Sequence, residues 1–216
     1  MKRSAFTLAE LVLGMALMAM IGLAVAGASS VLTRSYTDDE QAYKSLHAAR
    51  ISLLKVGAEI HHARLVLHAD GYYFMIWNED TGGDDKINIS ELVLVRHDAA
   101  SSRLLRHQVT YPSSLHPILV ALLDQQLSLN TLVVSPAYSM SSLLNTLYCQ
   151  TTVLAEDVDS FDVWLNGQAP LGETVVVSIR IGEGKTGCTL RNAYSVRNST
   201  ADKVGIANGQ WHLMGN

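Results

Sequence analysis

The residues best spaced for chemistry form an acidic loop between Asp80 and Glu91. Calcium takes six to eight oxygen ligands, and a twelve-residue loop supplies them from alternating positions that end in a bidentate glutamate. On that spacing the candidate ligands are Asp80, Asp84, the backbone carbonyl of Lys86, Asn88 and Glu91. Gly82 stands where a side-chain ligand is usual, and Asp85 stands where glycine makes the sharp turn. The loop is therefore a candidate Ca2+ site, with a solvated acidic hairpin as the alternative.

Other residues capable of chemistry form no catalytic pattern. The eight histidines include no HExxH pair, so we expect ordinary surface or half-buried side chains. The segment 182–186 ends like a phosphate-binding loop, but Ile179 occupies the place of the first glycine of that motif. We interpret the segment as a hairpin turn. With no nucleophile elbow either, the sequence predicts a protein that is not an enzyme.

The chain contains two cysteines, Cys149 and Cys188, and no CxxC pair. A zinc site built on cysteines is therefore not expected. If this part of the chain lies outside the cytoplasm, the two thiols could form one disulfide, which the sequence spacing alone does not decide.

Composition limits the remaining possibilities. The 216 residues suit one globular domain with an attached element. Charged residues make up only 17% of the chain and the net charge is −4, with the basic residues scattered. We therefore expect no nucleic-acid partner.

The element that explains the low charge is an apolar run from Phe6 to Leu32. A membrane-spanning helix needs about 20 apolar residues. Lys2 and Arg3 precede the run and acidic residues 38–40 follow it, so the positive-inside rule predicts a cytoplasmic N-terminus and an exported remainder. Glu10 is the one charge within the run, and an intramembrane carboxylate requires either a partner or a position near the headgroups.

The segment Ala5-Phe6-Thr7-Leu8-Ala9-Glu10-Leu11 resembles the class III signal of type IV prepilins. The resemblance implies cleavage between Ala5 and Phe6 by a prepilin peptidase, which also methylates the new amino group of Phe6. It implies that Glu10 pairs with the N-terminal amine of a neighbouring subunit. Ala5 departs from the usual glycine before the cut, and because alanine is also small we expect slower cleavage.

A conventional secretory signal is the alternative to this interpretation. The segments 24–26 and 26–28 both fit the A-x-A cleavage pattern, and cleavage there would release a soluble protein. Against this alternative, the apolar core is longer than the usual 7–15 residues and Glu10 interrupts it. A second class of function is a membrane-anchored or secreted binding module that does not polymerise, with calcium as a candidate ligand.

Helical spacing of apolar residues continues past the membrane run and predicts one helix from Phe6 to Arg64, with a break at residues 33–37 as the alternative. The β-like runs that follow are 72–77, 92–96, 104–111, 161–165, 175–181 and 189–196. Helices are expected at 115–129, with Ser114 as N-cap, and at 143–147. The predicted fold class is α+β and pilin-like: a long N-terminal helix packed on a mostly antiparallel sheet.

The order of elements is similar to that of J-type minor pseudopilins and W-type minor pilins, with residues 115–152 as an insertion. We thus expect a leader at 1–5, a membrane and assembly helix at 6–32, an amphipathic extension at 33–66 and an exported domain at 67–216. The resemblance implies a structural subunit of a type IV pilus or a type II secretion pseudopilus. It would cross the inner membrane once, expose its domain to the periplasm or the exterior, and join a filament of other pilin or pseudopilin subunits.

Overall fold

The computed structural model describes residues 7–80, 86–182, 184–196 and 203–214. The chain divides into two compact units, residues 1–44 and residues 45–216. Among the described residues, the first unit consists of the N-terminal part of the long helix α1, and the second contains the end of α1 and all the strands.

Helix α1 runs without interruption from Leu8 to His62, which confirms the single long helix and excludes the predicted alternative of a break at residues 33–37. Within the second unit, α1 buries one stripe at three- and four-residue spacing, the spacing that places side chains on one helix face. The stripe consists of Ser45, Ala49, Ser52, Leu53, Val56, Gly57 and Ile60. Its small residues allow close approach, since a side chain at Gly57 would collide with the Tyr194 ring.

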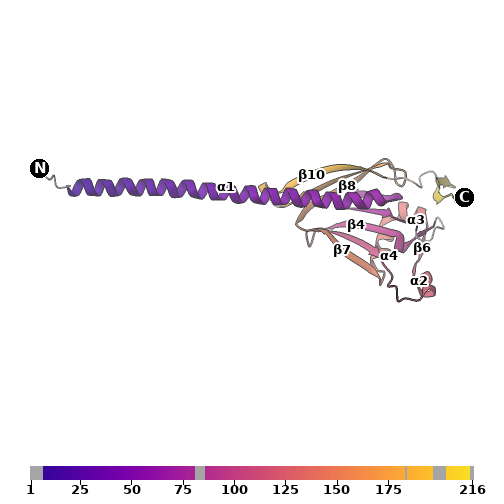
Figure 1. Cartoon of the computed structure of the whole chain (residues 1–216). Helices are drawn as coiled ribbons and strands as arrows, with labels where there is room; N and C mark the ends of the chain where they lie inside the picture. Colours follow the sequence, from indigo (N-terminus) through magenta and orange to yellow (C-terminus); the bar gives the residue numbers. More distant parts are fainter. Residues whose placement is uncertain (1–6, 81–85, 183, 197–202, 215–216) are drawn as a thin grey trace. The chain divides into compact units, whose positions relative to one another are not determined.

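The second unit is built on an eight-stranded sheet in the order β10-β9-β8-β1-β2-β4-β5-β7, and every neighbouring pair is antiparallel (Figure 1). The strands are β1 (Leu65–Gly71), β2 (Tyr73–Trp77), β4 (Leu92–Asp98), β5 (Arg103–Val109), β7 (Cys149–Ala155), β8 (Val158–Asn166), β9 (Thr174–Ile181) and β10 (Cys188–Ser195). This architecture confirms the predicted long N-terminal helix on a mostly antiparallel sheet.

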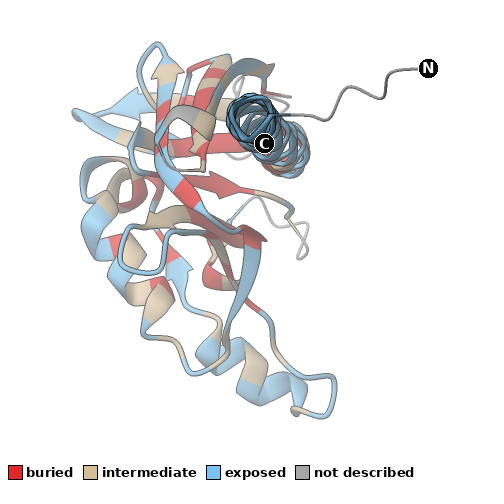
Figure 2. Ribbon diagram, turned by 90° about the vertical axis from the view of Figure 1, so that its left-hand side faces the viewer, coloured by how far each residue is buried: buried red, intermediate tan, exposed pale blue. Residues whose placement is uncertain are grey.

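Each face of the sheet has its own core. On one face the α1 stripe packs against Phe74, Ile76, Phe161 and the alternating valines and isoleucines of β9. On the other face Trp77, Met75 and Leu92 pack under helix α3 (Leu129–Val134), helix α4 (Pro136–Leu144) and the strand β11 (Val204–Ala207), which pairs with β12 (Gln210–Leu213). Buried residues accordingly concentrate on the strands, while the surrounding helices keep exposed faces (Figure 2).

The insertion differs from the prediction. The chain leaves the sheet after β5 and returns in the adjacent strand β7, so the inserted segment is 110–148. The helix expected at 115–129 is only α2 (Pro117–Leu123), and the helix expected at 143–147 lies earlier, as α4. The N-cap of α2 is His116 and not Ser114, because Pro117 fixes the first helical position. The strand β6 (Gln126–Leu127) follows and pairs with β3 (Ile87–Asn88).

Two strands were not predicted from the sequence: β1, in the middle of the sheet, and β7, at one edge. Strand β1 overlaps the last two residues of the extension predicted at 33–66, and most of β7 lies in the insertion predicted at 115–152. The turn at residues 182–186 is confirmed, since a short 3-10 helix (Gly184–Thr186) there joins β9 to β10.

Candidate functional site

The first described residues of α1 form a cap on their own helix. Thr7 donates two hydrogen bonds to the Glu10 carboxylate, one from its backbone N and one from its Oγ1, each 3.0 Å long. In return, Thr7 Oγ1 accepts a hydrogen bond from the Glu10 backbone N at 3.4 Å. This reciprocal arrangement is a capping box, which satisfies N–H groups that the first turn of a helix leaves without partners. Glu10 thus has a local role beside the predicted intersubunit pairing. The predicted cleavage site, Ala5 and Phe6, lies outside the described residues.

The part of α1 that follows is apolar on all sides. Large side chains from Leu8 to Leu32 are more than half exposed around the whole circumference. A helix that is apolar all round requires burial in protein or in lipid. It is the one helix in the described part of the chain that is long and apolar enough to cross a membrane, and its most apolar window has no buried residue. These properties fit a single-pass membrane anchor.

Polar contacts fix the end of α1 on the sheet. Glu59 Oε1 lies 2.8 Å from Arg106 Nε of β5, an ion pair in which both side chains are mostly buried. Lys55 Nζ donates to the Leu154 carbonyl of β7 at 3.0 Å, and the Tyr194 hydroxyl of β10 donates to the Leu53 carbonyl at 2.6 Å. Strands near both edges of the sheet are thereby tied to one helix.

Asp80 and Glu91, two of the candidate calcium ligands, contact other side chains of the chain. Asp80 forms an ion pair with Arg64 at a distance of 3.2 Å. The Arg64 guanidinium also lies above the Trp77 ring, 5.3 Å from the ring centroid. Glu91 is 2% exposed and directed inward, where its Oε2 accepts from Trp77 Nε1 at 3.1 Å and from the Asn88 backbone N at 3.2 Å. Glu91 therefore stabilises the core beneath the loop.

The remaining candidate ligands do not complete a site among the described residues. Lys86 is exposed, Asn88 is half-buried, and Asp84 lies outside the described residues. Within the described ranges no group of three or more His, Cys, Asp or Glu side chains is placed to hold a metal ion. Calcium binding by this loop stays a prediction. The spacing of the loop did not reveal that Glu91 accepts hydrogen bonds from Trp77 and Asn88.

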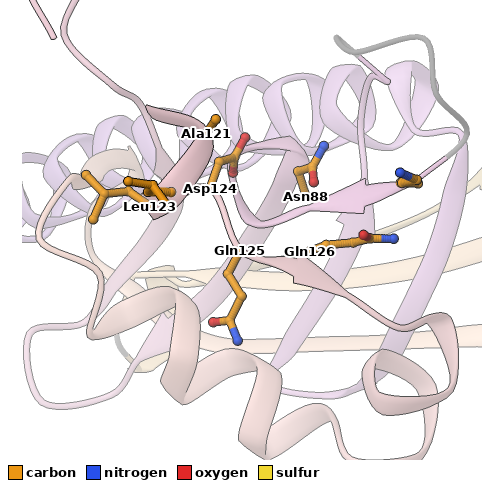
Figure 3. A pocket seen from close by; sticks show the side chains of 8 residues that line it. Asn88, Ala121, Leu123, Asp124, Gln125 and Gln126 are labelled. Atoms are coloured by element: carbon orange, nitrogen blue, oxygen red, sulfur yellow. The ribbon is translucent and has the colours of Figure 1, made fainter. Parts of the chain in front are cut away.

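The end of this loop and the insertion enclose a groove of about 660 Å³ (Figure 3). Asp124, directly after α2, accepts from the Ser90 backbone N at 3.0 Å and from Ser90 Oγ at 2.7 Å. The Ile89 backbone N donates to the Gln125 carbonyl at 3.0 Å. Figure 3 shows Asp124 and Asn88 among the side chains that line the groove, together with Leu123. The loop and the insertion thus form one surface.

A buried histidine on the second face of the sheet was not predicted. His107 of β5 is 4% exposed, and its Nε2 accepts a hydrogen bond from Arg96 Nε at 3.2 Å. Its Nδ1 must then bear the proton, which it donates to Thr151 Oγ1 at 2.9 Å. Burial, reinforced by the Arg96 charge, lowers the pKa of His107 to about 4. The other seven histidines are surface or half-buried side chains, as expected.

The structure does not join the two cysteines, a question that the sequence left open. Cys149 and Cys188 are free thiols, and they lie on β7 and β10, the two opposite edge strands of the sheet. Seven strand spacings of about 4.8 Å separate those edges by roughly 30 Å, whereas a disulfide requires Cα atoms about 5–6 Å apart. Burial raises the pKa of the Cys149 thiol, which further lowers its reactivity.

The sequence contains one signal for this surface that the predictions did not include. From Gln108 to Ala155 the only charged residue is Asp124. Such a residue is expected to have a specific partner, and the structure supplies it in Ser90. Arg64 and Trp77, by contrast, acquire their roles only through the fold.

Comparison with known proteins gives no assignment. No protein-family model, curated protein or solved structure matches the chain.

Proposed function

We propose that this protein is a pilin-like structural subunit, a minor pilin or pseudopilin of a type IV pilus or a type II secretion pseudopilus. In this proposal a prepilin peptidase cleaves between Ala5 and Phe6 and methylates Phe6. The apolar part of α1 holds the subunit in the inner membrane with its N-terminus in the cytoplasm. The domain that begins at the end of α1 lies in the periplasm or outside the cell, where it contacts neighbouring subunits.

The observation that carries the proposal is an apolar helix with a single acidic residue near its start, continuous with a stripe that packs on an antiparallel sheet. Because the side chains between Leu8 and Leu32 are exposed all round, the helix needs an apolar environment before and after any assembly. A bilayer supplies that environment to a free subunit, and a bundle of like helices supplies it within a filament.

The position of Glu10 supports an assembly role. A carboxylate within a membrane helix is costly unless it is paired. The Thr7 cap satisfies hydrogen-bond capacity, but among the described residues no cation compensates the negative charge of Glu10. The amine of Phe6 on a neighbouring subunit would neutralise that charge in a medium where opposite charges attract strongly.

The test is the N-terminus of the mature protein, determined by mass spectrometry of the membrane-extracted chain after coexpression with a prepilin peptidase. We expect a methylated N-terminal Phe6, and uncleaved chain when the peptidase is catalytically inactive. A mature protein that starts near Gly27 or Ser29 would show secretory processing and would contradict the proposal.

A further inference from the structure

We propose that helix α2 and the adjoining groove form a dimerisation surface, and that its occupant is the same surface on a second copy of this chain. The inference concerns the insertion and does not depend on filament assembly.

Helix α2 leaves its aliphatic side chains exposed. None of its seven residues is buried. The exposed fractions are 65% for Ile118, 48% for Leu119, 76% for Leu122 and 46% for Leu123. A helix of this length is not stable by itself, so the fold must hold it in place. The Asp124–Ser90 and Ile89–Gln125 hydrogen bonds anchor its end while its apolar sides remain open.

Charge is nearly absent from the whole insertion. Between Gln108 and Ala155 the exposed positions hold mainly aliphatic and uncharged polar residues, and the one formal charge is Asp124. Depletion of charged residues marks the centre of protein–protein interfaces. Amphipathic helices that lie on membranes instead present Lys and Arg on their polar side, and α2 contains neither. The composition therefore favours a protein partner over a lipid surface.

The charges at the rim of this surface favour a second copy of this chain over other protein partners. A two-fold interface places the same patch on both sides, so it must be complementary to itself. The aliphatic side chains of α2 meet this requirement because they do not repel their own copies. The groove beside them is lined by one cation, Lys86, and one anion, Asp124, together with the amides Asn88, Gln125 and Gln126 (Figure 3). The groove thus carries both signs of charge, so two copies of it do not repel each other.

The size of the surface predicts a weak, reversible dimer. One short helix and one groove are small beside a standard stable interface. Confinement of two copies to one membrane raises their effective concentration and favours such contacts. The experiment must therefore use the full chain in a membrane.

We would purify the unprocessed full chain, without peptidase or other pilin-like proteins, and reconstitute it in neutral phosphatidylcholine liposomes. In a background with Cys149→Ser and Cys188→Ser, Leu122→Cys provides a site for a short bis-maleimide cross-linker. Ile206→Cys is the matched control, because Ile206 is 64% exposed and lies on β11, outside α2 and the groove. We expect covalent dimers from Leu122→Cys and few from Ile206→Cys. Adding Ile118→Asp should reduce the Leu122 dimer by roughly tenfold, since an unpaired carboxylate would be buried at the interface.

Three results would overturn the proposal. Equal cross-linking at both positions would mean that other parts of the chain, such as the membrane helix, bring the copies together. Cross-linking unaffected by Ile118→Asp, in a variant that melts at the wild-type temperature, would show that α2 is not the contact. An environment-sensitive fluorophore on Leu122→Cys whose emission shifts blue with added lipid, at constant protein density in the membrane, would assign α2 to the bilayer.

Discussion

The indole Nε1 of Trp77 donates a hydrogen bond to Glu91 Oε2 at a distance of 3.1 Å, and the Trp77 side chain is fully buried. The same oxygen accepts from the Asn88 backbone N. Replacing Glu91 by Ala should cost about 2–4 kcal/mol of unfolding free energy, because two donors lose their acceptor. Replacing it by Gln should cost about 1 kcal/mol, since the amide oxygen still accepts. Denaturant unfolding in detergent, followed by tryptophan fluorescence, measures both values.

The control for this prediction is Glu79→Ala, which removes an exposed carboxylate of the same loop. Surface changes of this kind alter the free energy of unfolding by less than about 0.5 kcal/mol. Equal losses for Glu79→Ala and Glu91→Ala would refute the role assigned to the Trp77–Glu91 hydrogen bond.

Calcium removal is expected to leave the stability of the domain unchanged. A calcium loop needs its last glutamate for bidentate coordination, whereas Glu91 is bound to Trp77 and Asp80 is paired with Arg64. Thermal melts with excess EGTA and with millimolar calcium should therefore coincide. A calcium-dependent rise in Tm that disappears in Glu91→Gln would restore the interpretation based on sequence spacing.

Sequence predictions succeeded where an element is determined by its own residues, and failed where it is determined by residues distant in the chain. Helix α1 and strand β9 were found because the spacing of their own apolar residues marks the buried face. The length of α2 was overestimated because Asp124 ends the helix through Ser90, a residue distant in sequence. Glu91 was assigned by spacing within its loop, but its direction is set by Trp77, fourteen positions earlier. The cysteines could not be placed without the strand order.

Acidification should destabilise the domain through His107. The pKa of His107 is lowered to about 4 in the folded state, against about 6.5 in an unfolded chain. The unfolded state therefore binds more protons between these values, and stability falls as the pH drops from 6.5 to 4. The stability from this group is fully present above pH 6.5, and its full loss is up to about 3 kcal/mol. Denaturant unfolding at pH 7 and at pH 4.5 measures the difference.

The His107→Gln variant isolates this contribution. Glutamine can accept from Arg96 and donate to Thr151 without titrating in this range, so its stability should depend less on pH than that of the wild type. The exposed His61→Gln serves as the control and should retain the full wild-type pH dependence. Identical pH profiles for His107→Gln and the wild type would exclude His107 as the source.

Close packing of α1 on β10 makes Gly57 intolerant of a side chain. An added Cβ would collide with the Tyr194 ring. Alanine is favoured over glycine within a helix by about 1 kcal/mol, yet we expect Gly57→Ala to destabilise the domain by about 1–3 kcal/mol because the core must shift. In a Tyr194→Leu background the same change should be neutral or stabilising, and a double-mutant cycle of unfolding free energies would show this coupling. Additive effects would contradict the steric explanation.

Glu10 offers the sharpest test of the proposed assembly role, because its two suggested functions respond differently to one substitution. Glutamine at position 10 preserves a capping box with Thr7 but removes the charge that would pair with the amine of Phe6 on a neighbouring subunit. If pairing matters, Glu10→Gln should be cleaved and methylated normally, yet be depleted from sheared filaments roughly tenfold or more, as loss of a charge pair in low dielectric requires. Thr7→Ala is the converse control, since it weakens the cap but keeps the carboxylate. Immunoblots of the filament and membrane fractions, read beside the N-terminal masses, separate assembly from processing. Normal incorporation of Glu10→Gln together with loss of Thr7→Ala would limit Glu10 to capping its own helix.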